Sequence, residues 1–134
     1  MNVTIEFVAG RKHKKSNDCW ADALALATGK TYRQAYNLLK NISNENGSIN
    51  MGIFSGTMQV FGFTILEIDD DNMTVEKTIK FFDSKTNKLV MFAMKKDSKM
   101  GHIVYVNDSK IHDFKDPDFL THQVYEIYIK ELEE

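Results

Sequence analysis

The chain has 134 residues, a formal net charge of −2 and a hydrophobic content of 43%, which predict a single globular domain, 1–134, with its own core. This charge balance gives no argument for nucleic-acid binding. No apolar stretch approaches the roughly 18 residues of a membrane-spanning helix, and none has the form of a signal peptide. We therefore expect a cytoplasmic protein. A single cysteine excludes an intrachain disulfide, which fits a reducing compartment.

The N-terminal part of the chain predicts a strand, a loop and a buried helix. Residues 2–8 alternate in polarity as a strand does. Residues 9–17 form a polar loop, in which the basic cluster 11–15 is either a solvated surface or a local positive potential. The alanine- and leucine-rich run from Cys19 to about Thr28 predicts a buried helix, which Gly29 ends.

Further helices are expected in the middle of the chain. Thr31 and Gln34 have the spacing of a capping box and predict the start of a second helix. A short helix is expected over 53–61 and a strand over 63–68, and a helix capped by Thr74 is expected to run through Phe82.

The C-terminal part predicts four strands, over 88–94, 101–106, 110–114 and 124–129. The expected fold is therefore α+β, with N-terminal helices, the cysteine helix first, packed on a C-terminal antiparallel sheet. Large apolar side chains at helix or strand spacing are expected in the core: Phe54, Met58, Phe61, Phe63, Phe81, Phe82, Met91, Phe92 and Met94.

Cys19 is placed where a reactive thiol would be expected. Ser16 or Asp18 is a candidate N-cap, which puts Cys19 in the first helical turn. Unpaired backbone N–H groups and the positive end of the helix dipole favour the thiolate, the nucleophilic form of cysteine. A thiolate catalyst also needs a base and a group that orients the base.

His102 and Asp113 are the candidates for these two roles. The sequence from Gly101 to Phe114 predicts a β-hairpin. With a two-residue turn at 107–108 or 108–109, His102 and Asp113 share one face of the hairpin. A three-residue turn would shift the register and bring His112 to that face instead.

These residues resemble the active site of the papain-like cysteine peptidase superfamily. Cys19-Trp20-Ala21 is similar to the cysteine-tryptophan-alanine of the papain helix, and Gly101-His102 is similar to its histidine strand. The order of cysteine, histidine and aspartate is also the papain order, and small bacterial and phage papain-like domains look closest. The resemblance implies a papain-like fold over roughly residues 15 to 130.

The chain departs from the papain pattern at two positions. His13 stands where papain-like enzymes usually carry the glutamine of the oxyanion hole, and Asp113 replaces the asparagine of papain. Asn17 is the nearest amide that could donate to an oxyanion, together with the Cys19 N–H.

The resemblance predicts a cysteine-dependent hydrolase of peptidase or amidase type, acting through an acyl-thioester. The expected residues are Cys19, His102, Asp113 and Asn17, and the expected substrate is a peptide, a protein or another compound with an amide. The alternative is a non-catalytic binding or inhibitor protein on the same scaffold, for example a phage protein that blocks a host factor.

No cofactor or metal is expected. His102, His112 and His122 are ten residues apart, which matches no compact ligand spacing. The acidic run 69–71 lacks the glycine and the distal glutamate of a calcium loop and predicts a solvated turn.

Overall fold

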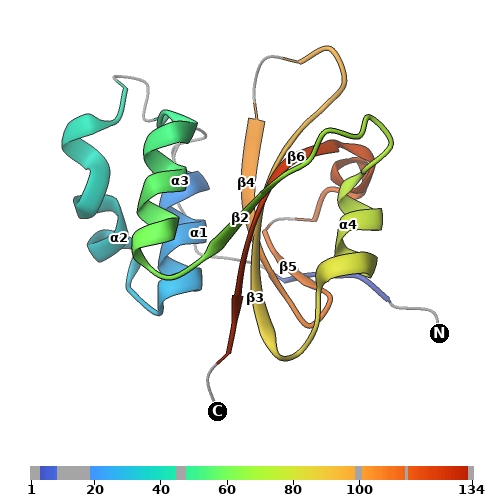
Figure 1. The fold of residues 1–134 in the computed structure, drawn as a ribbon, viewed down its shortest axis with the longest axis horizontal. Coiled ribbons are helices and arrows are strands. Elements are labelled where there is room, and N and C mark those ends of the chain that lie inside the picture. Colours follow the sequence, from blue (N-terminus) through green and yellow to red (C-terminus); the bar gives the residue numbers. More distant parts are fainter. Residues whose placement is uncertain (1–3, 9–18, 45–47, 99–100, 114, 133–134) are drawn as a thin grey trace.

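The computed structural model describes residues 4–8, 19–44, 48–98, 101–113 and 115–132. Its centre is a six-stranded sheet in the order β1-β5-β4-β3-β6-β2 (Figure 1). The strands are β1 (Glu6–Val8), β2 (Thr64–Glu67), β3 (Asn87–Met94), β4 (Gly101–Asn107), β5 (Lys110–His112) and β6 (Gln123–Glu131). The helices are α1 (Cys19–Thr28), α2 (Tyr32–Leu39), α3 (Met51–Val60) and α4 (Val75–Phe82), with 3-10 turns η1 (Lys40–Ile42) and η2 (Pro117–Thr121).

The fold has three layers, with the sheet in the middle. Helices α1, α2 and α3 lie on one side of the sheet, and α4 lies on the other (Figure 1). Each side encloses its own buried cluster, because strand residues alternate between the two faces. Val90, Ile103 and Tyr128 belong to the cluster under α1–α3, whereas Met91 and Val104 belong to the cluster under α4. The central strands are therefore apolar on both faces.

The α+β class is confirmed, but the expectation of a purely antiparallel, C-terminal sheet is wrong. β1 pairs in parallel with β5, with Phe7 beside Ile111, and β2 pairs antiparallel with β6. The N-terminal strand takes this place because Phe7 packs on the cluster under α4. Alternation within a strand predicts its buried face but gives no information about its neighbour.

The helix ends follow the expected local chemistry. The Thr31 side chain accepts from the Gln34 backbone N–H and completes the capping box, and Thr74 caps α4. Gly29 has a φ of 73°, the left-handed conformation that glycine adopts after a helix. Helix α3 begins two residues before the predicted start, because the Asn50 side chain caps it.

Phe81 is exposed, contrary to the prediction that it is a core residue. Helix α4 buries Val75, Thr78 and Ile79, which lie on one face of the helix. Phe81 points away from that face and is 76% exposed, although its ring contacts Phe82. By contrast, the predicted core residues with least exposure are Phe54, Met58, Phe63 and Met91.

Over the part of the chain that the structure describes, no helix combines the length and the apolar character needed to cross a bilayer.

The structure predicts that Gly101→Ala destabilises the protein. A Cβ at Gly101 would overlap the ring of Phe92, so this ring would have to rotate out of its packing. We expect the free energy of unfolding to fall by about 1–2 kcal/mol, measured by urea denaturation. The matched control is Gly56→Ala in α3, where a Cβ meets nothing within 4 Å and should stabilise the helix by about 0.5–1 kcal/mol. An unchanged unfolding midpoint for Gly101→Ala would contradict the packing described for β4.

Candidate active site

His102 lies on a part of β4 that has a neighbouring strand on one side only. Strand β3 pairs with β4 along its length, from Leu89–Val106 to Met94–Gly101. Strand β5 pairs with β4 only at Val106 and Asn107. The sheet is therefore open beside His102, and this opening gives other segments access to its imidazole.

A two-residue turn fixes the position of Asp113. Asn107 pairs with Lys110, so the turn consists of Asp108 and Ser109, with φ of 52° and 62°. Positive φ at both positions is typical of a type I′ hairpin. The two-residue turn is one of the alternatives that the sequence left open, and it places Asp113 on the same face as His102.

The turn is held from outside the hairpin by Asp83, at the end of α4. The Ser109 backbone N–H donates a hydrogen bond to a carboxylate oxygen of Asp83. Burial raises the pKa of Asp83, although this and other backbone hydrogen bonds lower it. Asn107 ties the same end of β4 to β3 by donating to the Asn87 carbonyl over 2.6 Å.

Asp113 forms a hydrogen bond with His102. The bond joins an Asp113 carboxylate oxygen to Nε2 of the imidazole. Phe119 of η2 packs edge-on against the same ring, with centroids 5.5 Å apart and planes at 87°. The carboxylate and the aromatic ring together restrict the imidazole, which leaves Nδ1 as the nitrogen available for proton exchange with another group.

Cys19 is brought to His102 by the packing of α1. The helix begins at Cys19 and is buried on nearly every side, and the small residues Ala21 and Ala25 allow it to pack closely in the cluster that includes Ile103 of β4. Cys19, His102 and Asp113 line one cavity of about 10 Å³. This is barely the volume that one water needs, and Cys19 lies close enough to His102 to form a hydrogen bond with its imidazole.

The electrostatics of the site favour a charged imidazole. Burial lowers the pKa of His102, but hydrogen bonds with Asp113 and Cys19, together with the charges of these groups, outweigh burial. The pKa of His102 is raised from 6.5 to about 10. His112, three residues beyond the turn, shows the opposite behaviour, because burial and the nearby Lys110 lower its pKa.

Asn17, the expected oxyanion donor, lies outside the described residues, as do the basic cluster 11–15 and His13. By its position, the backbone N–H of Cys19 belongs to the first helical turn, whose N–H groups have no acceptor within the helix.

Three further residues shape the site and are absent from the sequence prediction. Asp22 lies one turn after Cys19, is only 9% exposed and lines the cavity. An acidic residue within an alanine-rich run was the signal that could have drawn attention to it. Asp83 holds the hairpin turn, and Phe119 packs on the imidazole. No local sequence pattern links either residue to His102.

The described residues contain no group of three or more His, Cys, Asp or Glu side chains that could hold a metal ion.

Comparisons with protein-family models, with curated proteins and with solved structures found no match to this chain.

The raised pKa predicts that His102 remains protonated at neutral pH. In a titration followed by imidazole NMR, we expect the His102 resonances to change near pH 10 and those of His112 to change below pH 6.5. Asp113→Asn removes a negative charge and an acceptor for the charged ring, so it should lower the pKa of His102. The matched control is Asp116→Asn, an exposed position next to η2. A His102 titration near 6.5 in the unmodified protein would contradict the assigned pairing.

Proposed function

We propose that the protein is a cysteine-dependent hydrolase that cleaves amide bonds through an acyl-thioester, on a papain-like scaffold. The single observation that carries the proposal is the convergence of Cys19, His102 and Asp113 on one cavity. The three groups supply a nucleophile, a proton donor and acceptor, and an orienting carboxylate. They come from α1, β4 and the residue after β5, three segments that are separate in the chain.

The first half of the reaction uses the charged form of His102. The Cys19 thiolate attacks the carbonyl carbon, and the carbonyl oxygen becomes an oxyanion near the Cys19 N–H at the start of α1. The intermediate then expels the amine, which takes the proton from the His102 imidazolium. The products of this half are the free amine, a Cys19 thioester and a neutral imidazole.

The second half follows from the loss of the thiolate. Two of the causes that raise the pKa of His102 are the hydrogen bond to Cys19 and its charge, and acylation removes both. The pKa of His102 therefore falls in the acyl-enzyme, and the neutral ring accepts a proton from water. The water oxygen attacks the thioester, and the carboxylic acid and the Cys19 thiolate are released.

Asp113 acts on this cycle through the imidazole. Its hydrogen bond to Nε2 holds the tautomer that exposes Nδ1 to the thiol, and its charge stabilises the imidazolium. We therefore assign Asp113 a positioning role.

A second candidate function is a binding protein on the same scaffold. The small cavity at Cys19, about 10 Å³, favours this alternative. The described residues enclose too little space there for an extended substrate, which would have to bind outside the cavity. Such a protein would retain its binding when Cys19 is replaced by alanine.

The proposal predicts turnover that depends on Cys19 and His102. With p-nitrophenyl acetate, intact mass should detect one acetyl group on Cys19, and the reaction should continue beyond one equivalent. His102→Ala should lower the turnover rate by about 10²–10⁴-fold, as expected for the loss of a general acid–base group. His122→Ala is the matched control, since this histidine pairs with Asp118 and does not line the cavity.

Hydrolysis of amides is tested with a peptide library made from a bacterial proteome, with new termini identified by mass spectrometry. We expect cleavage by the unmodified protein and none by Cys19→Ser. Equal acetylation of Cys19 in the unmodified protein and in His102→Ala, without peptide cleavage, would overturn the proposal in favour of the binding protein.

A further inference from the structure

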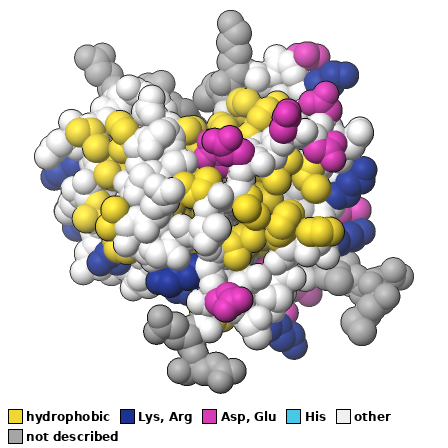
Figure 2. Space-filling view, in the orientation of Figure 1, with side chains coloured by type: hydrophobic (Ala, Val, Ile, Leu, Met, Phe, Trp, Pro, Cys, Tyr) yellow, Lys and Arg dark blue, Asp and Glu magenta, His cyan; other side chains and the backbone are white. Residues whose placement is uncertain are grey.

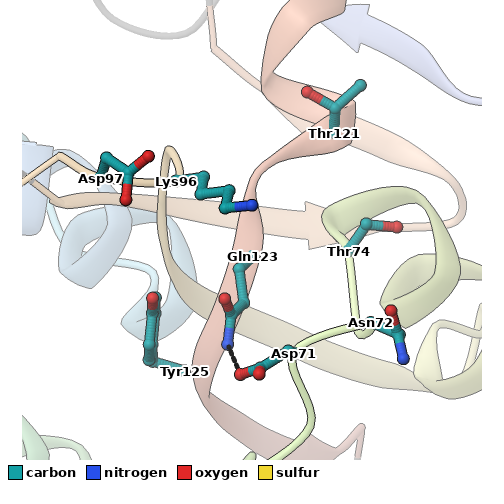
Figure 3. Close-up of a pocket in the computed structure, with 8 residues that line it drawn as sticks. All are labelled: Asp71, Asn72, Thr74, Lys96, Asp97, Thr121, Gln123 and Tyr125. Carbon is teal, nitrogen blue, oxygen red and sulfur yellow. Dashed lines mark hydrogen bonds between the residues drawn. The ribbon is translucent and has the colours of Figure 1, made fainter.

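A polar cavity of about 500 Å³ lies at the end of the sheet where β4 begins. Its walls come from the β2–α4 connection, the β3–β4 connection and the first residues of β6 with Thr121 just before them (Figure 3). Among the side chains that line it are Asp71, Thr74, Lys96, Asp97, Gln123 and Tyr125. Nothing in the proposed chemistry of Cys19 uses this cavity.

The register of the sheet places this cavity near His102. Gln123 pairs with Met94 on one side of β3, and Met94 pairs with Gly101 on the other. Two strand spacings of about 4.8 Å put Gln123 about 10 Å from Gly101, the residue before His102. An extended peptide covers this distance in about three residues.

A continuous aromatic surface joins the two places. The Phe92 ring lies against Gly101, at the position where a side chain would stand. The Tyr125 ring follows, with its centroid 6.3 Å from that of Phe92, and Tyr125 lines the cavity. Both rings are only partly buried. A peptide chain that leaves the Cys19 site across Gly101 would therefore meet Phe92 and then Tyr125 before it reaches the cavity.

The lining of the cavity is acidic and rich in hydrogen-bond acceptors. Asp71 and Asp97 contribute carboxylates from two separate segments, against one ammonium from Lys96. The Gln123 amide donates to the Asp71 carboxylate over 3.3 Å and so holds it at the wall (Figure 3). Acidic side chains also gather over the connection between β2 and α4, which includes residues 69–71 (Figure 2).

This combination matches the side chain of lysine or arginine. An ammonium or guanidinium offers only donors, which carboxylates and hydroxyls such as that of Thr74 accept. The aliphatic stem of such a side chain packs on an aromatic ring while its charge stays in a polar environment, which is what Tyr125 and the carboxylates provide.

We propose that this cavity is a substrate subsite that accepts a lysine or arginine side chain of a bound peptide, at least three residues from the scissile bond by the spacing between Gly101 and Gln123. The role of this cavity in substrate selection rests on the proposed function. The binding of a cationic side chain can be measured without turnover.

The first experiment measures binding to the full-length Cys19→Ser protein by NMR. The probe is Nα-acetyl-lysine N-methylamide, and the matched uncharged probe is Nα-acetyl-norleucine N-methylamide. We expect the lysine probe to shift the backbone amides of Lys96, Thr121 and Gln123 in a saturable way, and the norleucine probe to shift them weakly. Equal shifts with both probes, or none, would overturn the inference.

Two substitutions test the carboxylates. Asp71→Asn keeps an acceptor for Gln123, and Asp97→Asn suits the positive φ of 65° at this position, because asparagine adopts that conformation readily. Each should weaken lysine binding about two- to fivefold, the range for one exposed charge pair. Glu131→Gln removes the same charge at the far end of β6 and should leave lysine binding unchanged. Equal binding by all three variants would overturn the inference.

The second experiment measures kcat/KM for peptides cleaved by the unmodified protein, with lysine or norleucine at successive positions on each side of the scissile bond. We expect a preference for lysine at one position, three or more residues from the scissile bond, reduced by Asp71→Asn. Turnover without any lysine preference would overturn the inference and leave the proposed function intact. Lysine binding in a protein that cleaves nothing would overturn the proposed function and leave the cation site intact.

Discussion

The candidate site depends on the register of the β4–β5 hairpin. Successive side chains of a strand point to opposite faces, so one additional residue in the turn would exchange Asp113 for His112 beside His102. The positive φ of Asp108 and Ser109 makes the shorter turn possible, and the hydrogen bond from the Ser109 N–H to Asp83 holds it. The acidic partner of the imidazole is thus set by a turn that lies at the opposite end of β4.

The site also depends on the short length of β5. Because β5 pairs with β4 only at Val106 and Asn107, β5 does not cover the start of β4. Asp113 approaches this open edge from one direction and Cys19 from another. Helix α1 reaches this place through its alanines, which reduce the distance between the helix and the sheet. A longer β5 would complete the sheet and cover the edge at which the three groups meet.

The charges of the site are mutually dependent, which gives the proposed cycle its direction. The Asp113 carboxylate and Cys19 raise the pKa of His102, so the resting imidazole carries a proton. In the proposed cycle this proton goes to the leaving amine, acylation removes the contribution of Cys19, and the imidazole then accepts a proton from water. The acidic cavity near Tyr125 is a separate feature, since Gln123 in its wall lies two strand spacings, about 10 Å, from Gly101.

The sequence by itself determined the local features. Thr31 and Gln34 specified a capping box, Gly29 specified a helix end, and the apolar periodicity specified most helices and strands, because these depend on residues a few positions apart. It also suggested Cys19 and His102 as candidates, since a thiol and an imidazole stand out chemically, but it left Asp113 and His112 as alternative partners of His102. Only the tertiary structure decided the parallel pairing of β1 with β5, the exposure of Phe81, the length of the hairpin turn and the roles of Asp22, Asp83 and Phe119. These depend on contacts between segments far apart in the chain, and the physical reason is that burial and strand pairing are fixed by neighbours that no local pattern specifies.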